Sequence, residues 1–159
     1  MCSSDLGLRE RDDGHYRAVE ETGYLTGCCL LARREVWEQV GVLDEAYFIY
    51  AEDADWCLRA RAKGFRLLFV PTARLWHKVS ASAGAQSRWK IYQRLRANLT
   101  LFARNARGLA RLTWAPAFVA QQIVLAGWLT LSGHAEAALA VPRALWDGML
   151  GRDPARVTR

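Results

Sequence analysis

Long apolar runs alternate along this chain with stretches whose charged and apolar positions follow a helical spacing. Residues 23–32 form a nearly uninterrupted apolar run, which predicts a buried strand entered through a glycine turn. Residues 33–40 carry two valines four positions apart, the spacing of one helix face. Gly41 follows this segment, where the end of a helix favours positive φ. Residues 42–51 are expected to form a loop.

A second helix is predicted over residues 52–63, because its charges follow the helix dipole. Acidic residues occupy its first turn and basic residues its last turn, and Gly64 ends it. The sequence of residues 65–70 predicts a second strand, which Pro71 ends. The order strand, helix, helix, strand indicates part of an α/β layer.

The second half of the chain is predicted to be helical. Residues 80–86 are small and polar and predict a loop or hinge. Residues 87–111 contain seven basic residues and no acidic residue, whereas residues 112–133 contain no charge. This uncharged run is long enough to cross a bilayer, but Pro116 and a glutamine pair interrupt it, so spanning and surface-lying arrangements both stay open. Residues 135–150 predict a further apolar helix.

Charge divides the chain into two parts. Residues 1–84 hold 11 Lys/Arg and 13 Asp/Glu, whereas residues 85–159 hold 11 Lys/Arg and 3 Asp/Glu. The basic part is expected either to present a solvated charged face or to meet an anionic surface. A membrane surface is favoured because the uncharged segment follows directly. Nucleic acid is not expected as a partner, because no recognised nucleic-acid-binding module is present.

The four cysteines predict neither a zinc site nor a disulfide framework. No C-x-x-C pair occurs, and a bond between the adjacent Cys28 and Cys29 would be strained. We expect buried, reduced thiols of a cytosolic protein.

Three carboxylates, Glu52, Asp53 and Asp55, fall within four residues. Like charges at this spacing repel each other, so these carboxylates are expected to bind a cation, a proton or a substrate hydroxyl. Alternatively, they lie in water as the solvated start of a helix. The aromatic residues before them, from Tyr47 to Tyr50, are expected either to stack on a sugar or to fill the core.

Segment 24–79 resembles the C-terminal half of the catalytic domain of family 2 glycosyltransferases, most closely the bacterial rhamnosyltransferase type. Many short pieces carry this resemblance, in the family's order and spacing: Thr26-Gly27, Arg33-Arg34-Glu35, Val40-Gly41, Leu43-Asp44-Glu45, Phe48-Ile49-Tyr50, Glu52-Asp53-Ala54-Asp55 with Arg59, Gly64-Phe65-Arg66, Val70-Pro71-Thr72-Ala73 and His77.

The resemblance implies a GT-A fold, a doubly wound α/β sheet that binds a nucleotide sugar. It also implies a preceding half domain with the nucleotide site and an Asp-x-Asp metal motif, so the chain is expected to be a C-terminal fragment. The expected organisation is a ragged N-terminal segment at 1–22, the acceptor-side half of the GT-A domain at 23–84, and a helical membrane-associating tail at 85–159.

The resemblance also implies roles for individual residues. Asp53 would be the catalytic base that deprotonates the acceptor. His77 would help hold Mg²⁺ or Mn²⁺, together with Asp-x-Asp ligands that this chain lacks. The acceptor-binding residues would be Thr26, Gly27, Glu52, Asp55 and Tyr50. From spacing alone, Thr26 and Gly27 could equally be a plain strand entry, and Arg59 is expected to pair with Asp55 four residues earlier.

The predicted function is that of an inverting glycosyltransferase in cell-envelope glycan synthesis. Its donor would be a nucleotide sugar such as dTDP-rhamnose, and its acceptor a lipid-linked sugar or a growing polysaccharide. It would act at the cytoplasmic face of the bacterial inner membrane, peripherally or with one hydrophobic segment. The alternatives are a membrane-anchored binding module without catalysis and a basic nucleic-acid-binding protein.

Overall fold

A computed structural model describes residues 16–76 and 87–152 of the chain. The chain divides into two compact units. The first comprises residues 1–44 and 52–79, and the second comprises residues 45–51 and 80–159. The predicted loop at 80–86 lies outside the described residues, as do His77 and Cys2.

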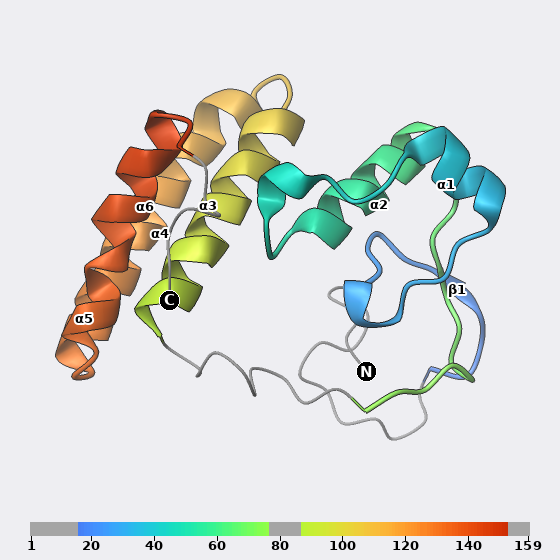
Figure 1. Ribbon diagram of the computed structural model, residues 1–159, viewed down its shortest axis with the longest axis horizontal. Helices are drawn as coiled ribbons and strands as arrows, with labels where there is room; N and C mark the ends of the chain where they lie inside the picture. The colour runs from blue at the N-terminus through green and yellow to red at the C-terminus, as the bar shows by residue number, and fades with distance from the viewer. Residues whose placement is uncertain (1–15, 77–86, 153–159) are drawn as a thin grey trace. The chain divides into compact units, whose positions relative to one another are not determined.

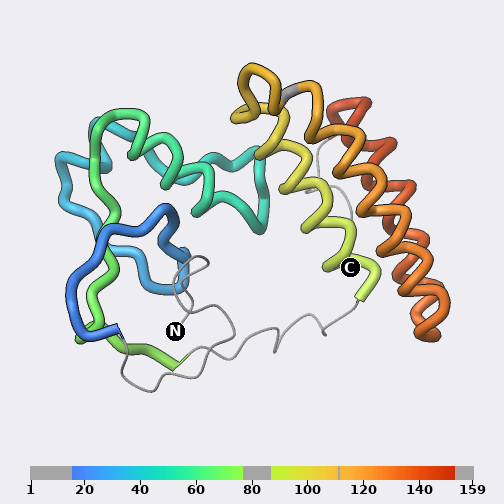
Figure 2. The backbone as a smooth tube through the Cα atoms, turned by 180° about the vertical axis from the view of Figure 1, so that it is seen from behind, coloured from blue at the N-terminus to red at the C-terminus, as the bar shows by residue number. Residues whose placement is uncertain are grey.

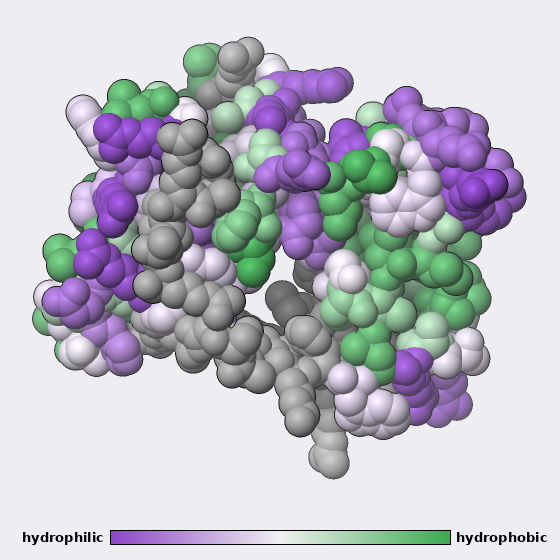
Figure 3. All heavy atoms as spheres, viewed as in Figure 1, coloured by the Kyte–Doolittle hydropathy of each residue, from purple (hydrophilic) through white to green (hydrophobic). Residues whose placement is uncertain are grey.

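The first unit contains two helices and a small sheet (Figure 1). Helix α1 spans Arg34–Val40 and helix α2 spans Glu52–Ala62. Strands β1 (Glu20–Glu21) and β2 (Leu68–Phe69) pair antiparallel, with Glu20 opposite Phe69. A 3-10 turn, η1 (Gly27–Cys29), lies between β1 and α1 in the sequence. Hydrophilic residues gather over α1 (Figure 3).

Both predicted helices of the first unit are confirmed, and glycines end both of them. Gly41 has φ 85° and donates its backbone N–H to the Trp37 carbonyl at the end of α1. Gly64 has φ 85° just after α2. An L side chain rarely adopts this conformation, which explains why glycine occupies both positions. In α2 the acidic first turn and the basic last turn match the helix dipole, as predicted.

The core of the first unit forms around Trp56, which is 2% exposed. Val40, Cys57, Ala60 and Leu67 complete this buried cluster. The indole of Trp37 packs against that of Trp56 with 4.6 Å between ring centroids. Because a buried indole N–H needs an acceptor, Trp56 donates to the Gly41 carbonyl at 2.8 Å. This contact ties the end of α1 to α2.

The prediction of a buried strand at residues 23–32 is wrong. This segment holds the η1 turn, and no strand is assigned to it. Cys28 and Cys29 are exposed, so the prediction of buried thiols is wrong for them, whereas Cys57 is buried. All three thiols are free. An apolar run becomes a strand only when a neighbouring strand pairs with its backbone, and in the described part of the chain none pairs with this one.

The predicted strand at 65–70 is confirmed only in part, because β2 covers two of its residues. Within residues 16–76 and 87–152, β1 and β2 form a single two-stranded antiparallel sheet. The described residues therefore do not themselves build the doubly wound parallel sheet that the resemblance implies. A parallel sheet requires neighbouring strands joined by crossover connections, and the described segments do not supply them.

The second unit is a helical bundle. Helix α3 spans Arg88–Asn105 and α4 spans Ala110–Leu131. The short helix α5 (Ala135–Ala138) leads into α6 (Ala140–Met149). The three long helices run in alternating directions (Figure 1), and from the opposite side α4 lies in front of α6 along much of its length (Figure 2). A 3-10 turn, η2 (Glu45–Tyr47), also packs in this unit against α3.

The predicted helix at 87–111 is confirmed as far as Asn105, where α3 ends. Gly108, with φ 56°, lies in the turn before α4. One apolar core joins α3, α4, α5 and α6 and contains Ile91, Tyr92, Leu95, Phe118, Leu129, Ala137, Ala138, Ala140, Val141 and Ala144. Tyr47 is buried as well, and the Arg104 guanidinium lies 5.5 Å from its ring centroid, so this aromatic residue fills core space.

Candidate active site

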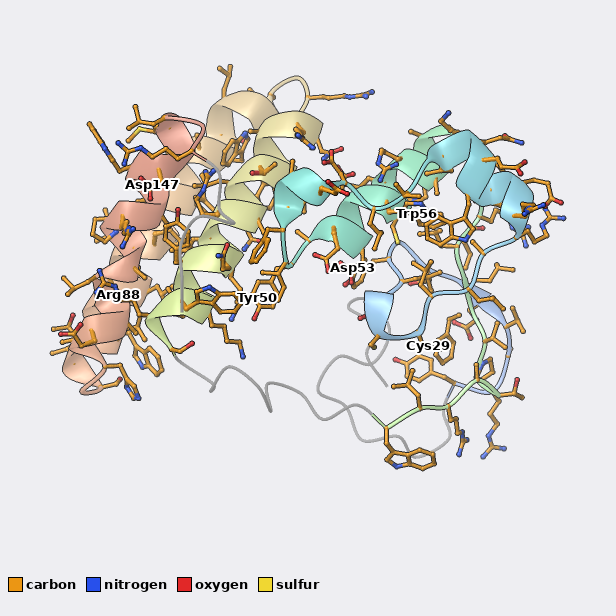
Figure 4. The ribbon with its side chains drawn as sticks, in the orientation of Figure 1. Cys29, Tyr50, Asp53, Trp56, Arg88 and Asp147 are labelled. Atoms are coloured by element: carbon orange, nitrogen blue, oxygen red, sulfur yellow. The ribbon has the colours of Figure 1, made fainter. Side chains whose placement is uncertain are left out.

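Asp53 lies in the first turn of α2, and hydrogen bonds hold its carboxylate on both oxygens. Its Oδ2 accepts from the Tyr24 hydroxyl at 2.6 Å and from the Gly27 backbone N–H at 2.7 Å. Its Oδ1 accepts from the Ala54 backbone N–H at 2.8 Å. Figure 4 shows the side chain on the side of α2 that faces the η1 segment. The carboxylate is therefore fixed in one orientation while the residue stays only half-buried.

The backbone of Gly27 lies next to this carboxylate. A Cβ built at Gly27 would lie 3.4 Å from both Cβ and Oδ2 of Asp53. An added methyl group would therefore meet Asp53 at ordinary van der Waals distance. The structure thus brings predicted site residues Gly27 and Asp53 together across 26 sequence positions. The hydroxyl oxygen of the adjacent Thr26 shares a hydrogen bond with Cys28 Sγ at 3.4 Å.

Tyr24 is a site residue that sequence reasoning missed. Burial, followed by the hydrogen bond to the Asp53 carboxylate, raises the pKa of the Tyr24 hydroxyl, so the phenol stays protonated and donates. Its ring also packs against the core cluster around Trp56. Only its position just before Thr26-Gly27 could have pointed to it, because it is 29 residues from Asp53 and shares no periodic pattern with it.

Glu52 has an environment different from that of Asp53. Its Oε2 is buried and makes no hydrogen bond in the described part of the chain. Burial and the neighbouring Asp53 charge raise the pKa of the Glu52 carboxyl, against the lowering effect of the backbone at the helix start. The two adjacent carboxyls thus differ in hydrogen bonding, although both belong to the predicted acidic cluster.

Asp55 is the buried member of the acidic cluster, at 4% exposed. Arg59 Nε donates to Asp55 Oδ2 at 2.8 Å, which confirms the predicted pair within α2. The other guanidinium nitrogens donate to the carbonyls of Val40 at 2.6 Å and Val42 at 2.8 Å. Asp55 and Arg59 therefore hold the end of α1 against α2, and an acceptor-binding role for Asp55 stays a prediction.

Tyr50 lies in a short segment with unusual backbone conformation. Phe48, Tyr50 and Ala51 have φ of 59°, 69° and 63°, values that residues other than glycine rarely adopt. Such conformations cost energy and often occur in ligand-binding segments. Tyr50 belongs to the second unit, so its predicted contact with the acceptor stays a prediction.

No group of three or more His, Cys, Asp or Glu side chains that could hold a metal ion occurs within residues 16–76 and 87–152. His77 lies outside the described residues. Metal binding by His77 stays a prediction, and we derive no catalytic step through a metal.

The carboxylate of Asp53 can act as a proton acceptor. A carboxylate offers about four lone-pair positions on its two oxygens. The Tyr24 and Gly27 donors occupy those of Oδ2, and the Ala54 N–H occupies one of those of Oδ1. Among the described residues no further donor reaches Oδ1, which leaves one lone pair for a hydroxyl that approaches to about 3 Å.

The protein-family model described as "Glycosyltransferase like family 2" matches residues 14–98. The chain is 44% identical over 62 residues to an N-acetylglucosaminyl-diphospho-decaprenol L-rhamnosyltransferase of Mycobacterium tuberculosis, which covers 39% of this chain and 20% of the relative. It is 34% identical over 74 residues to an O-antigen biosynthesis protein of Myxococcus xanthus, which covers 46% of this chain and 6% of the relative.

A third relative is a low-salt glycan biosynthesis hexosyltransferase of Haloferax volcanii, 29% identical over 62 residues, which covers 39% of this chain and 20% of the relative. The chain thus spans a fifth or less of the length of these relatives. No solved structure matches it. Because the family model covers more than half of the sequence, including Tyr24, Gly27 and Asp53, this chain belongs to the glycosyltransferase-like family 2.

Proposed function

We propose that the chain takes part in transferring a sugar from a nucleotide-sugar donor to a hydroxyl of a lipid-linked sugar or a growing polysaccharide, with inversion at the anomeric carbon. The observation that carries this proposal is the Asp53 carboxylate, fixed by Tyr24 and Gly27 within the segment that matches the family model. The names of the relatives support glycosyl transfer as the reaction class.

The chemical step follows from the geometry of Asp53. An acceptor hydroxyl that hydrogen-bonds to Oδ1 gives its proton to that oxygen while its own oxygen attacks the anomeric carbon of the donor. The bond from this carbon to the diphosphate breaks, and the nucleoside diphosphate leaves with the electron pair. The attack comes from the side opposite the leaving group, so the configuration inverts.

Tyr24 and Gly27 would position the base. Their two hydrogen bonds to Oδ2 fix the plane of the carboxylate, so that Oδ1 keeps a constant direction. A base held in this way loses no rotamer freedom when the acceptor binds. Glu52 and Asp55 flank Asp53, and we propose that Glu52, whose carboxyl has the raised pKa, contacts acceptor hydroxyls.

The departing diphosphate carries negative charge that must be stabilised, and a bound Mg²⁺ or Mn²⁺ would supply positive charge there. We propose that His77 contributes one ligand to that ion, with further ligands from outside the chain described here. This assignment rests on the resemblance alone.

The membrane and pathway assignments are also part of this proposal. The first relative is named for a decaprenol-linked substrate, which supports a lipid-linked acceptor. One helix segment of the second unit, Leu112–Leu131, is long and apolar enough to cross a membrane. We therefore place the activity at the cytoplasmic face of a bacterial inner membrane, in a GT-A type domain, with dTDP-rhamnose as the first donor to test.

The test is a transfer assay with radiolabelled donors. The chain, expressed in a protein that also carries the family's nucleotide-binding half domain, would be incubated with dTDP-rhamnose, UDP-sugars or GDP-sugars and with N-acetylglucosaminyl-diphospho-polyprenol, and labelled lipid would be extracted. Labelled lipid from one donor supports the proposal. Vesicle binding with no labelled product from any donor would contradict it and favour a membrane-anchored binding module.

A further inference from the structure

Helix α4 has an apolar outward face that the described residues of its own unit leave uncovered. Only 17% of the Leu112–Leu131 span is buried, although a core helix of this composition would be mostly buried. The exposed apolar side chains, called here the outward stripe, are Leu112, Val119, Ile123, Val124, Trp128 and Leu131. No charged residue lies between positions 112 and 133. An uncharged apolar face of this size indicates an apolar partner.

The opposite face of α4 packs against the other helices of the bundle. Phe118 and Leu129 are buried in the common core, and Trp114 and Leu125 pack against it. These positions are separated by three, four or seven residues or their sums, so they share one helix face from the first turns of α4 to its last. The helix therefore keeps its neighbours along its whole length.

Those neighbours could not accompany α4 across a bilayer. Asp147 of α6 is 4% exposed and accepts hydrogen bonds from Tyr92 at 2.9 Å and from Arg152 at 2.9 Å. Arg96 of α3 is also buried, and it donates to the Arg152 carbonyl at 2.6 Å. Charged groups at hydrocarbon depth are expensive. Because α4 shares its apolar core with α3 and α6, which carry these charged groups, lying along a membrane surface costs less free energy than crossing the membrane.

A groove between α3 and α4 lies beside the outward stripe and has polar as well as apolar side chains in its lining. Its volume is about 420 Å³, within the range of small-molecule sites. Its apolar lining includes Leu95, Val124 and Trp128, and its polar lining includes Arg94 and Gln121. Arg94 is exposed, and no described residue forms an ion pair with it. Apolar walls with one free guanidinium are complementary to the phosphate and upper acyl chain of an anionic lipid.

We propose that α4 docks in the plane of an anionic phospholipid bilayer, with the outward stripe immersed and Arg94 bound to a lipid phosphate at the α3–α4 groove. The occupant is the bilayer itself, because charge complementarity is continuous from the groove to the basic α3. The inference rests on the membrane assignment of the proposed function and deepens it, but its test is separate from glycosyl transfer, since vesicle binding requires no donor or acceptor.

The test is flotation of the full chain with preformed vesicles of phosphatidylcholine, with or without an equal part of phosphatidylglycerol. We expect Val124→Glu to lower binding to the anionic vesicles about tenfold or more. The matched control is Val42→Glu, because Val124 and Val42 are 72% and 75% exposed. Arg94→Gln should weaken binding about fivefold, whereas Arg61→Gln should leave it unchanged.

The in-plane orientation has its own measurement. Cysteines introduced by Thr113→Cys and Ser132→Cys lie near the two ends of α4. A membrane-impermeant maleimide added outside the vesicles should add one label to each variant beyond those of the parent chain. Labelling at one end only would show a spanning helix and overturn the proposal.

Other outcomes also decide the matter. Equal loss of binding for Val124→Glu and Val42→Glu would overturn the proposal, as would equal binding to neutral and anionic vesicles. A dimer in solution that Val124→Glu dissociates, together with no vesicle binding, would assign the stripe to a second copy of the chain. If Val124→Glu loses its helical circular dichroism, Ile123→Asn repeats the test with a neutral substitution.

Discussion

Replacing Arg59 with methionine tests how the first unit is held together. Methionine keeps much of the apolar stem but removes three hydrogen bonds of the guanidinium: to Asp55 Oδ2 and to the carbonyls of Val40 and Val42. The matched control is Arg34→Met. Arg34 and Glu38 form the same i,i+4 type of ion pair in α1, at 3.8 Å with side chains 87% and 66% exposed.

The structure predicts very different costs for the two substitutions. The Asp55 side chain is 6% exposed and that of Arg59 is 31% exposed. A hydrogen bond to a charged group contributes about 1.5–3 kcal/mol, and removing one partner of a buried pair costs about 3–5 kcal/mol. Because Arg59 is partly solvated, we expect Arg59→Met to cost about 3 kcal/mol. Arg34→Met should cost about 0–1 kcal/mol, as exposed pairs do.

Hydrogen exchange followed by mass spectrometry measures the loss of stability in the first unit by itself, because peptides from α1 and α2 report on that unit alone. A cost of about 3 kcal/mol corresponds to exchange more than a hundredfold faster for core amides of α2. Arg59→Lys should fall between the two variants, since lysine keeps the charge but lacks the planar fork. Equal exchange rates in Arg59→Met and Arg34→Met would refute the view that Arg59 holds α1 against α2.

Three further predictions follow from individual contacts. Asp147→Asn should destabilise the second unit by about 1.5–3 kcal/mol at pH 7. Burial opposes ionisation of Asp147, but its hydrogen bonds and the nearby arginines prevail and lower its pKa. The stability difference between wild type and Asp147→Asn, measured by urea unfolding, should therefore be largest at pH values above the usual aspartate pKa. It should vanish as the pH falls through the lowered pKa of the folded protein. Tyr24→Phe should lower kcat more than it changes KM, because it frees the base to rotate, and an unchanged kcat would contradict this. Maleimide should label Cys28 and Cys29 in the folded protein but not Cys57, and mass spectrometry of peptides would locate the labels.

Local signals predicted the helices of the first unit well. Charges placed along the helix dipole and glycines at positive φ are properties of a few adjacent residues, so α1 and α2 begin and end close to their predicted bounds. The predicted strand at 23–32 failed because strand formation depends on a distant partner. An apolar run with no partner strand adopts whatever its tertiary contacts allow, here the η1 turn whose Gly27 donates to Asp53.

The candidate site was predictable only in part for the same reason. The resemblance pointed to Asp53 and Gly27, and a four-residue spacing pointed to the Arg59 pair. Tyr24 was missed because its contact with Asp53 crosses 29 residues of sequence. The two carbonyls that Arg59 binds were missed because backbone acceptors have no sequence signature.

The rate of sugar transfer by Asp53→Asn, measured in a protein that also carries the family's nucleotide-binding half domain, tests the central claim most directly. Asparagine keeps the size of the side chain and one carbonyl oxygen for the Tyr24 and Gly27 donors, but it cannot take a proton from the acceptor. Glu35→Gln serves as the control, because Glu35 is an exposed acid of α1. We predict that Asp53→Asn folds like the wild type and loses transfer by a factor of about a hundred or more, while Glu35→Gln stays active. A rate for Asp53→Asn close to that of the wild type would contradict the assignment of Asp53 as the base.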